Sequence, residues 1–450
     1  MSSPADALRH SSLCRQLALL ARGETTSQAL TEAYLAAIER ENPERRAYLA
    51  VDAVGALAAA RDSDARRAAG KPLGRLDGIP LAIKDNLDVA GLVTTAGLPG
   101  RDRRVAARDA SAVARLRGAG AVILGKTSLD EGSLGTIGAN PIFGDVPNPH
   151  DPRRVAGGSS AGSAVAVAAG LCSAALGTDT LGSIRIPAAF CGIYGLRPTV
   201  GEVSSKGLWP ALPRLDAVGP LARSLDDLTV LLQVLDAYDA DDPRSRRRRV
   251  PLALPDWEPG KLRSGVVVDL DALGADAAAQ ATFAAALAAC DGSLGTRHEV
   301  RLADYNLPKL RRAALLMMEA GMLCADPADL EGCSTRLAAM LDFARSKSAV
   351  DYAAADRRLD QAVVHTRRLF ETVDVLLLPT VPHGPPPLGA AEPAQLADFC
   401  AFASLAGCPA LSLPLPQGHG LQLVGPPGSD LRLLELGEVL AAQIEAEAAF

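Results

Sequence analysis

Two serine clusters flanked by glycine are the residues of this sequence best suited to chemistry. The first is Gly157-Gly158-Ser159-Ser160, and the second is Thr180-Leu181-Gly182-Ser183. Glycine lets the backbone turn sharply beside each hydroxyl group. A serine presented on such a turn can attack a carbonyl carbon while neighbouring backbone N–H groups stabilise the developing oxyanion. Most serines in glycine-rich loops have no such role, so the two clusters alone are also consistent with purely structural loops.

A lysine upstream favours the catalytic interpretation. Residues 76–83 predict a turn followed by a short buried strand, and that strand ends at Lys84. Burying an ammonium group is costly, so a lysine in this position tends to lose its proton and can then act as a base. A single lysine at a strand end usually just reaches solvent. The combination of Lys84 with two serine clusters is what indicates catalysis.

Helices and strands alternate around these residues. Helical periodicity or small-residue composition predicts helices at 5–22, 26–40, 51–69, 110–118 and 161–175. Short apolar runs predict strands at 79–83 and 121–124. The alternation between residues 76 and 200 therefore predicts an α/β fold.

Composition narrows the class of protein. Of 450 residues, 48% are hydrophobic and 22% are charged, with a net charge of −6, which predicts a globular protein with no general affinity for nucleic acid or anionic membranes. No apolar stretch is long enough to span a membrane, and Met1–His10 lacks a signal-peptide pattern, so we expect a cytoplasmic protein. The basic run Arg244–Arg249 follows the acidic Asp239–Asp242, and segment 239–250 is expected to be an exposed loop.

Neither a metal nor a cofactor is expected. The eight cysteines include no CxxC pair and no metal-ligand spacing with histidine. Residues 120–127 match the phosphate-loop pattern G-x-x-x-x-G-K-T, but the four residues between the glycines are apolar and predict a buried strand. A phosphate loop needs its strand before the first glycine, so the match does not indicate nucleotide hydrolysis.

The sequence resembles the amidase signature family. Three motifs carry the resemblance, with Lys84 in GIPLAIKDN, Ser159 in GGSSAGSAVAVAAG and Ser183 in GTDTLGSIRIPA. Supporting stretches cover nearly the whole chain: TTAGLPG at 94–100, GAVILGKTS at 120–128, NPHDPRRVAGGSS at 148–160, YGLRPT at 194–199, LDAVGPLARSLDDL at 215–228, DVLLLPTVP at 374–382 and GCPALSLPL at 407–415. The least similar part runs from about residue 244 to 365.

The resemblance implies one α/β/α domain over residues 1–450, with a large mixed β-sheet covered by helices. Within it, residues 1–70 would form a helical N-terminal wrap, and 76–238 would hold the catalytic motifs. Residues 244–365 would form a variable region that shapes the substrate site, and 366–450 would return to the sheet.

The resemblance also implies a Ser–cis-Ser–Lys triad, with Ser183 as nucleophile, Ser159 as proton relay after a cis peptide bond from Gly158, and Lys84 as base. The residues with supporting roles would be Thr180, Leu181, Gly182 and Ser183 as oxyanion-hole N–H donors, Asp179, Arg185 and Ser160 as braces of the site, and Ser133 as a substrate contact. None of the six histidines falls inside a motif, which disfavours a Ser–His–Asp triad.

The function implied is an amidohydrolase that cleaves a linear, non-peptide C–N amide bond and releases ammonia or an amine. We expect a small-molecule amide as partner, no direct contact with nucleic acid or membrane, and a homodimer as an open option. Two alternatives remain: a glutaminase or amidotransferase A-type subunit that works with a partner, and a non-catalytic scaffold. Only Leu181 favours the scaffold, because family members usually have Thr-Gly-Gly-Ser where this chain has Thr-Leu-Gly-Ser. If the site is active, Leu181 is predicted to narrow the acyl pocket.

Overall fold

The computed structural model describes residues 7–246, 257, 258 and 260–448. Residues 5 and 6 of the predicted N-terminal helix and 247–249 of the basic run lie outside the described residues. Residues 239–246 form neither helix nor strand, as expected of a loop, but Asp242 is buried and accepts a 2.7 Å hydrogen bond from the Ser205 N–H. This part of the loop therefore packs onto the protein.

In the part of the chain that the structure describes, eleven strands form one mixed sheet. In spatial order they are β1 (Tyr48–Val51), β3 (Val122–Thr127), β2 (Pro80–Lys84), β4 (Ala174–Asp179), β6 (Ala217–Ala222), β5 (Tyr194–Arg197), β10 (Ala410–Leu415), β11 (His419–Val424), β9 (Val375–Pro379), β7 (Arg263–Val267) and β8 (Thr296–Val300). Parallel pairs lie near both ends of the sheet, and the central strands pair antiparallel. The predicted α/β fold with a large mixed sheet is confirmed.

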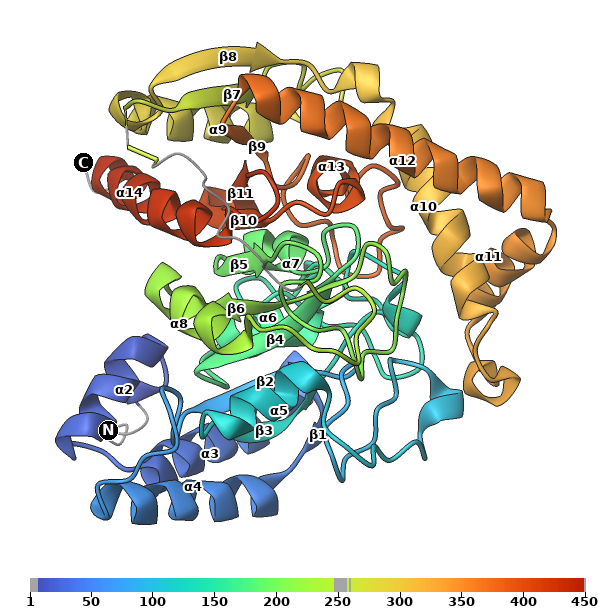
Figure 1. Cartoon of the computed structure of the whole chain (residues 1–450). Helices are drawn as coiled ribbons and strands as arrows, with labels where there is room; N and C mark the ends of the chain where they lie inside the picture. The colour runs from blue at the N-terminus through green and yellow to red at the C-terminus, as the bar shows by residue number, and fades with distance from the viewer. Residues whose placement is uncertain (1–6, 247–256, 259, 449–450) are drawn as a thin grey trace.

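Helices cover this sheet (Figure 1). They are α2 (Leu13–Arg22), α3 (Ser27–Arg45), α4 (Ala53–Ala68), α5 (Ser111–Gly118), α6 (Ala161–Ala168), α7 (Arg185–Phe190), α8 (Leu225–Leu235), α9 (Ala277–Ala289), α10 (Leu307–Met322), α11 (Thr335–Arg345), α12 (Ala349–Thr372), α13 (Asp398–Leu405) and α14 (Asp430–Ala448). Helices α3 and α4 pack beside the blue end of the sheet, whereas α10, α11 and α12 form a wall on the right of Figure 1.

The predicted helix over 161–175 is wrong in its second half. Helix α6 ends at Ala168, Gly170 adopts a left-handed conformation with φ +65°, and Ala174–Asp179 is strand β4 in the interior of the sheet. Small apolar residues fit a buried helix and a buried strand equally well, so composition did not separate the two. Similarly, the helix predicted from Val51 starts at Ala53, because Tyr48–Val51 pairs with β3 as an edge strand.

The sheet brings the predicted catalytic segments to one edge. Strands β2 and β4 are parallel neighbours, so their carboxyl ends, at Lys84 and Asp179, meet at the same edge. Helix α6 begins directly after Ser160 and packs on both strands. Its Gly162 lies so close to the chain at Ala47 that a Cβ would come within 2.3 Å of the Ala47 carbonyl oxygen. Small residues in α6 are thus required by this close packing.

Candidate active site

Lys84 is a fully buried lysine at the end of β2. Its Nζ lies 2.7 Å from Ser159 Oγ and 2.8 Å from Thr178 Oγ1. Burial lowers the pKa of Lys84 to about 7, although the carboxylates of Asp130, Asp179 and Asp216 oppose the shift. At neutral pH a large fraction of Lys84 is therefore uncharged, with a lone pair available beside the Ser159 hydroxyl.

Ser159 and Ser160 connect the glycine turn to strand β4. The peptide bond between Gly158 and Ser159 is cis, as the resemblance predicts, and the Ser159 side chain is buried. Ser160 Oγ donates to the Thr178 carbonyl at 3.1 Å and accepts the Thr178 N–H at 3.2 Å. The Ser160 N–H donates to the Ser183 carbonyl at 3.0 Å. Ser160 thereby ties the Ser159 turn to the segment that carries Ser183.

Asp179 clamps the turn that carries Ser183. Its carboxylate accepts hydrogen bonds from the Gly182 N–H at 2.8 Å and the Ile184 N–H at 3.3 Å. The Arg185 guanidinium donates to the same carboxylate at 2.8 and 2.9 Å, and Arg197 Nη1 at 3.2 Å. Burial alone would raise the pKa of Asp179, but Arg185 and Arg197 hold it well below its usual range. Asp179 therefore remains an anion that fixes the turn.

The backbone N–H groups of residues 180–183 differ in whether they are free to donate to an oxyanion. The Gly182 N–H is engaged by Asp179, so it cannot also serve an oxyanion. Within the described residues, the N–H groups of Thr180, Leu181 and Ser183 donate no hydrogen bond. Gly182 has φ +127°, and a Cβ there would lie 2.6 Å from Cys400 Cβ, whereas Leu181 keeps a negative φ. Three of the four predicted donors are thus free.

A cavity of about 550 Å³ opens in front of Ser183. Its residues near the turn include Ser133, Thr136, Thr180, Leu181 and Ser183, its apolar wall includes Leu315, Met318 and Met340, and its charged residues are Arg311, Arg312, Arg336 and Glu392. The arginines are paired with carboxylates: Arg311 with Asp398, Arg312 with Glu319 at 3.4 Å, and Arg336 with Glu392. The cavity therefore combines an apolar passage with paired charges of both signs.

Several residues of the site carried no prediction from the sequence. Asn86 Nδ2 donates to Thr178 Oγ1 at 3.0 Å and to Ser133 Oγ at 3.2 Å, which links the lysine environment to the cavity wall. Thr180 Oγ1 donates to the buried Asp216 carboxylate at 2.6 Å. Asn86 follows Lys84 in the KDN motif, and Asp216 lies in the LDAVGPLA stretch, so the motifs contained them without indicating their role.

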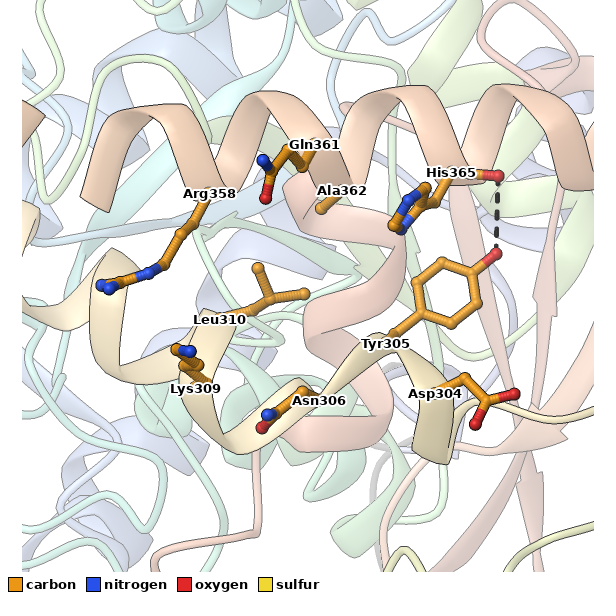
Figure 2. Close-up of a pocket in the computed structure, with 9 residues that line it drawn as sticks. All are labelled: Asp304, Tyr305, Asn306, Lys309, Leu310, Arg358, Gln361, Ala362 and His365. Atoms are coloured by element: carbon orange, nitrogen blue, oxygen red, sulfur yellow. Dashed lines mark hydrogen bonds between the residues drawn. The ribbon is translucent and has the colours of Figure 1, made fainter. Parts of the chain in front are cut away.

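Figure 2 shows a different pocket, between α10 and α12. It has a volume of about 240 Å³, and Tyr305 Oη lies 3.4 Å from the His365 carbonyl oxygen across it. None of the triad residues lines it.

In the described part of the chain, no cluster of three or more histidine, cysteine, aspartate or glutamate side chains could hold a metal ion. None of the described helices combines the length and apolar character that a membrane span requires.

Comparison with known proteins shows which family and which solved structures the chain resembles. The family model Amidase matches residues 29–434. The A-type subunit of a glutamyl-tRNA(Gln) amidotransferase from Roseiflexus sp. (strain RS-1) is 38% identical over 93% of both chains. One solved structure, of a vestigial protein complex that reveals the origins of an s-triazine catabolic enzyme, is 30% identical with a TM-score of 0.86, covering 95% of this chain and 98% of that one. The structure of 6-aminohexanoate cyclic dimer hydrolase complexed with substrate is 27% identical with a TM-score of 0.85, covering 97% of both chains.

The expected set of partners is contradicted by these relatives. The sequence predicted a small-molecule amide, no direct nucleic-acid contact and, as an option, a second copy of the chain. The relative from Roseiflexus is by name one subunit of an amidotransferase for glutamyl-tRNA(Gln). Net charge misled the prediction, because an overall charge of −6 says nothing about which larger assembly a protein joins.

Proposed function

This chain belongs to the amidase family, and we propose that it cleaves the C–N bond of a carboxamide through an acyl-enzyme on Ser183, as the ammonia-releasing subunit of a larger assembly. The observation that carries the chemistry is the buried contact of 2.7 Å between Lys84 Nζ and Ser159 Oγ, next to the clamped Ser183 turn. Identity of 38% with an amidotransferase subunit supports the place in an assembly.

Acylation begins with neutral Lys84. Lys84 takes the proton of Ser159 while Ser159 takes the proton of Ser183, and Ser183 Oγ attacks the amide carbon. The free N–H groups of Thr180, Leu181 and Ser183 are the available donors for the oxyanion. Collapse of the tetrahedral intermediate breaks the C–N bond, and the proton returns through Ser159 to the leaving nitrogen, which departs as ammonia.

Deacylation uses the same groups in reverse order. Water replaces ammonia, loses a proton through Ser159 to Lys84, and attacks the Ser183 ester. The carboxylic acid then leaves, and Ser183 recovers its proton. Positive charge forms on Lys84 in both half-reactions, when Ser183 or the attacking water loses its proton.

The charged residues of the cavity support an amino-acid amide such as glutamine as the substrate. A zwitterionic head needs a cation for its carboxylate and an anion for its ammonium, and Arg336 and Glu392 both line the cavity. The apolar wall, with Met318 and Met340, would accommodate the methylene groups between head and amide. Paired charges that are already held in place cost little reorganisation when the substrate binds.

A stand-alone amidohydrolase is the second candidate. The TM-score of 0.85 with 6-aminohexanoate cyclic dimer hydrolase, over 97% of both chains, favours it. The two candidates share the Ser183 chemistry and differ in the need for a partner.

The test measures ammonia release from glutamine and from a panel of simple amides, with the purified chain and with the chain recovered together with its bound proteins. Glutamine turnover that rises at least tenfold with a co-purifying partner supports the assembly. If the purified chain alone turns over other amides as fast as the chain recovered with its bound proteins, the stand-alone enzyme is supported. Failure of a fluorophosphonate to label Ser183 in either preparation would instead indicate a non-catalytic scaffold.

A further inference from the structure

Asp130 is a fully buried carboxyl group beside the triad to which the mechanism above gives no role. It lies in the loop after β3, and its oxygens accept the Gly138 N–H at 3.0 and 3.1 Å and the Ala139 N–H at 3.2 Å. No ion pair to Asp130 forms among the residues that the structure describes. A buried carboxyl group held only by backbone amides is costly, and such groups are concentrated at functional sites.

The carboxyl group of Asp130 touches the turn that carries Ser159. A Cβ built on Gly158 would lie 2.0 Å from Asp130 Oδ1, so the carboxyl oxygen occupies the space beside the Gly158 Cα. On the other side, a Cβ on Gly135 would lie 2.2 Å from Asp130 Oδ2. The carboxyl group is thus fixed between the cavity loop and the Ser159 turn, with no room for a larger side chain.

We infer that Asp130 is a positioning residue for the Lys84 base: it seats the Gly158–Ser159 turn and supplies the negative charge that favours proton uptake by Lys84. This inference rests on the proposed function, because it concerns the same proton relay. Lys84 must gain a proton each time Ser183 attacks, and it does so in a buried space where a nearby carboxylate acts with little screening.

The charged surroundings agree with this role. Lys84 faces Asp130, Asp179 and Asp216, of which Asp179 is already neutralised by Arg185 and Arg197. Asp216 accepts hydrogen bonds from Thr180 and from the N–H groups of Ala211 and Leu212. Asp130 itself faces Glu392, Arg336 and Lys84, and burial raises its pKa to about 7. Burial therefore favours the neutral form of each group, and the attraction between Asp130 and Lys84 favours the charged forms.

The direction of the expected shift in the pH profile follows from the negative charge of Asp130. Removing a negative charge near Lys84 destabilises its ammonium form, so its apparent pKa falls. Because activity needs neutral Lys84, the rate of Ser183 activation falls as the pH drops through that pKa. This fall in rate is the acid limb of the pH profile, and a neutral residue at 130 should move it to lower pH. The same change should also lower the plateau, which is the maximal rate reached at higher pH.

The experiment follows the rate of Ser183 labelling by a fluorophosphonate between pH 5 and 9, in the full chain and in D130N, D130S and D130E. Labelling needs no amide substrate, so absence of labelling in the wild type would overturn the proposed function, whereas labelling with an unmoved limb would overturn only this inference. D269N is the matched control, because Asp269 is also buried and accepts two backbone N–H groups, from Leu302 at 3.1 Å and Ala303 at 2.7 Å.

We expect D130N and D130S to shift the acid limb down by about one pH unit and to lower the plateau roughly tenfold. D130E, which keeps the charge but does not fit, should lower the plateau and leave the limb near its wild-type position. D269N should change neither. An unmoved limb in D130N, or loss of the folded state in both neutral variants while D269N folds, would show that Asp130 is only structural and would overturn the inference.

Discussion

The charged side chains at the turn around Ser183 are buried, whereas two arginines on the wall formed by α10 and α11 are exposed. At the turn, Asp179, Arg185 and Arg197 are completely buried and bound to one another and to backbone groups. At the wall, the side chains of Arg312 and Arg336 are 48% and 45% exposed, and among the described residues each forms an ion pair with one carboxylate, Glu319 and Glu392 respectively. Buried ion pairs are expensive to disrupt, whereas exposed pairs are screened by solvent and contribute little.

This contrast separates the residues that support acylation of Ser183 from the residues that select the amide substrate. The buried network fixes the backbone that presents Ser183, so changes there should abolish turnover or unfold the protein. Arg312, Arg336 and Glu392 line the cavity, so changes there should alter which amide is accepted and leave the acylation machinery in place. Four sets of substitutions test that division, beginning with the one of largest expected effect.

Ser183→Ala and Lys84→Ala should each reduce amide hydrolysis by roughly four orders of magnitude or more, because members of a catalytic unit act together. The double variant should be scarcely slower than either single variant. Steady-state ammonia release, with circular dichroism as a check of folding, gives the answer. Near-wild-type turnover in Ser183→Ala would remove the turn from the chemistry.

Asp179→Asn should destabilise the fold by about 3–5 kcal/mol, because it leaves two buried guanidinium groups without their anion. The measurement is the free energy of unfolding from urea titration, with Asp356→Asn as the control, since its ion pair with Arg214 is 43% exposed on the Asp356 side. Equal losses in the two variants would contradict the contrast between buried and exposed pairs.

Leu181→Gly should widen the cavity next to Ser183, since Leu181 lines it. We expect kcat/KM for bulky relative to small acyl amides to rise by a factor equivalent to about 1–3 kcal/mol. Both rates are measured in parallel on the same preparation. If both fall together at a constant ratio, Leu181 serves packing and does not select the acyl group.

Arg336→Ala should produce the smallest change, a rise in KM for glutamine of several-fold to about tenfold with kcat little altered, because the guanidinium is partly screened by solvent. Arg345→Ala provides the control, since Arg345 is 59% exposed, pairs with Asp342 on the same helix, and does not line the cavity. An equal drop in kcat and kcat/KM for Arg336→Ala would place this arginine in the chemistry of the turn.

The sequence predicted the parts of this protein that depend on local pattern. Lys84 ends an apolar strand, and the two serine clusters stand beside glycines, so residue type and order indicated a catalytic site and the α/β class. The arrangement of Lys84, Ser159 and Ser183 as a triad came from the resemblance to the amidase signature family. The comparisons then established the family over residues 29–434. The roles of the individual site residues stay predictions until the variants above are measured.

Only the tertiary structure decided the rest, because the contacts concerned join residues that are distant in sequence. Pairing with β2 and β6 made Ala174–Asp179 a strand, although its small residues also suited a helix. Arg197 reaches Asp179 from β5, and Asp130 reaches Gly158 from the loop after β3. No spacing along the chain encodes such contacts. They arise when strands from separate segments pack into one sheet, and burial there then sets the charge state of Lys84.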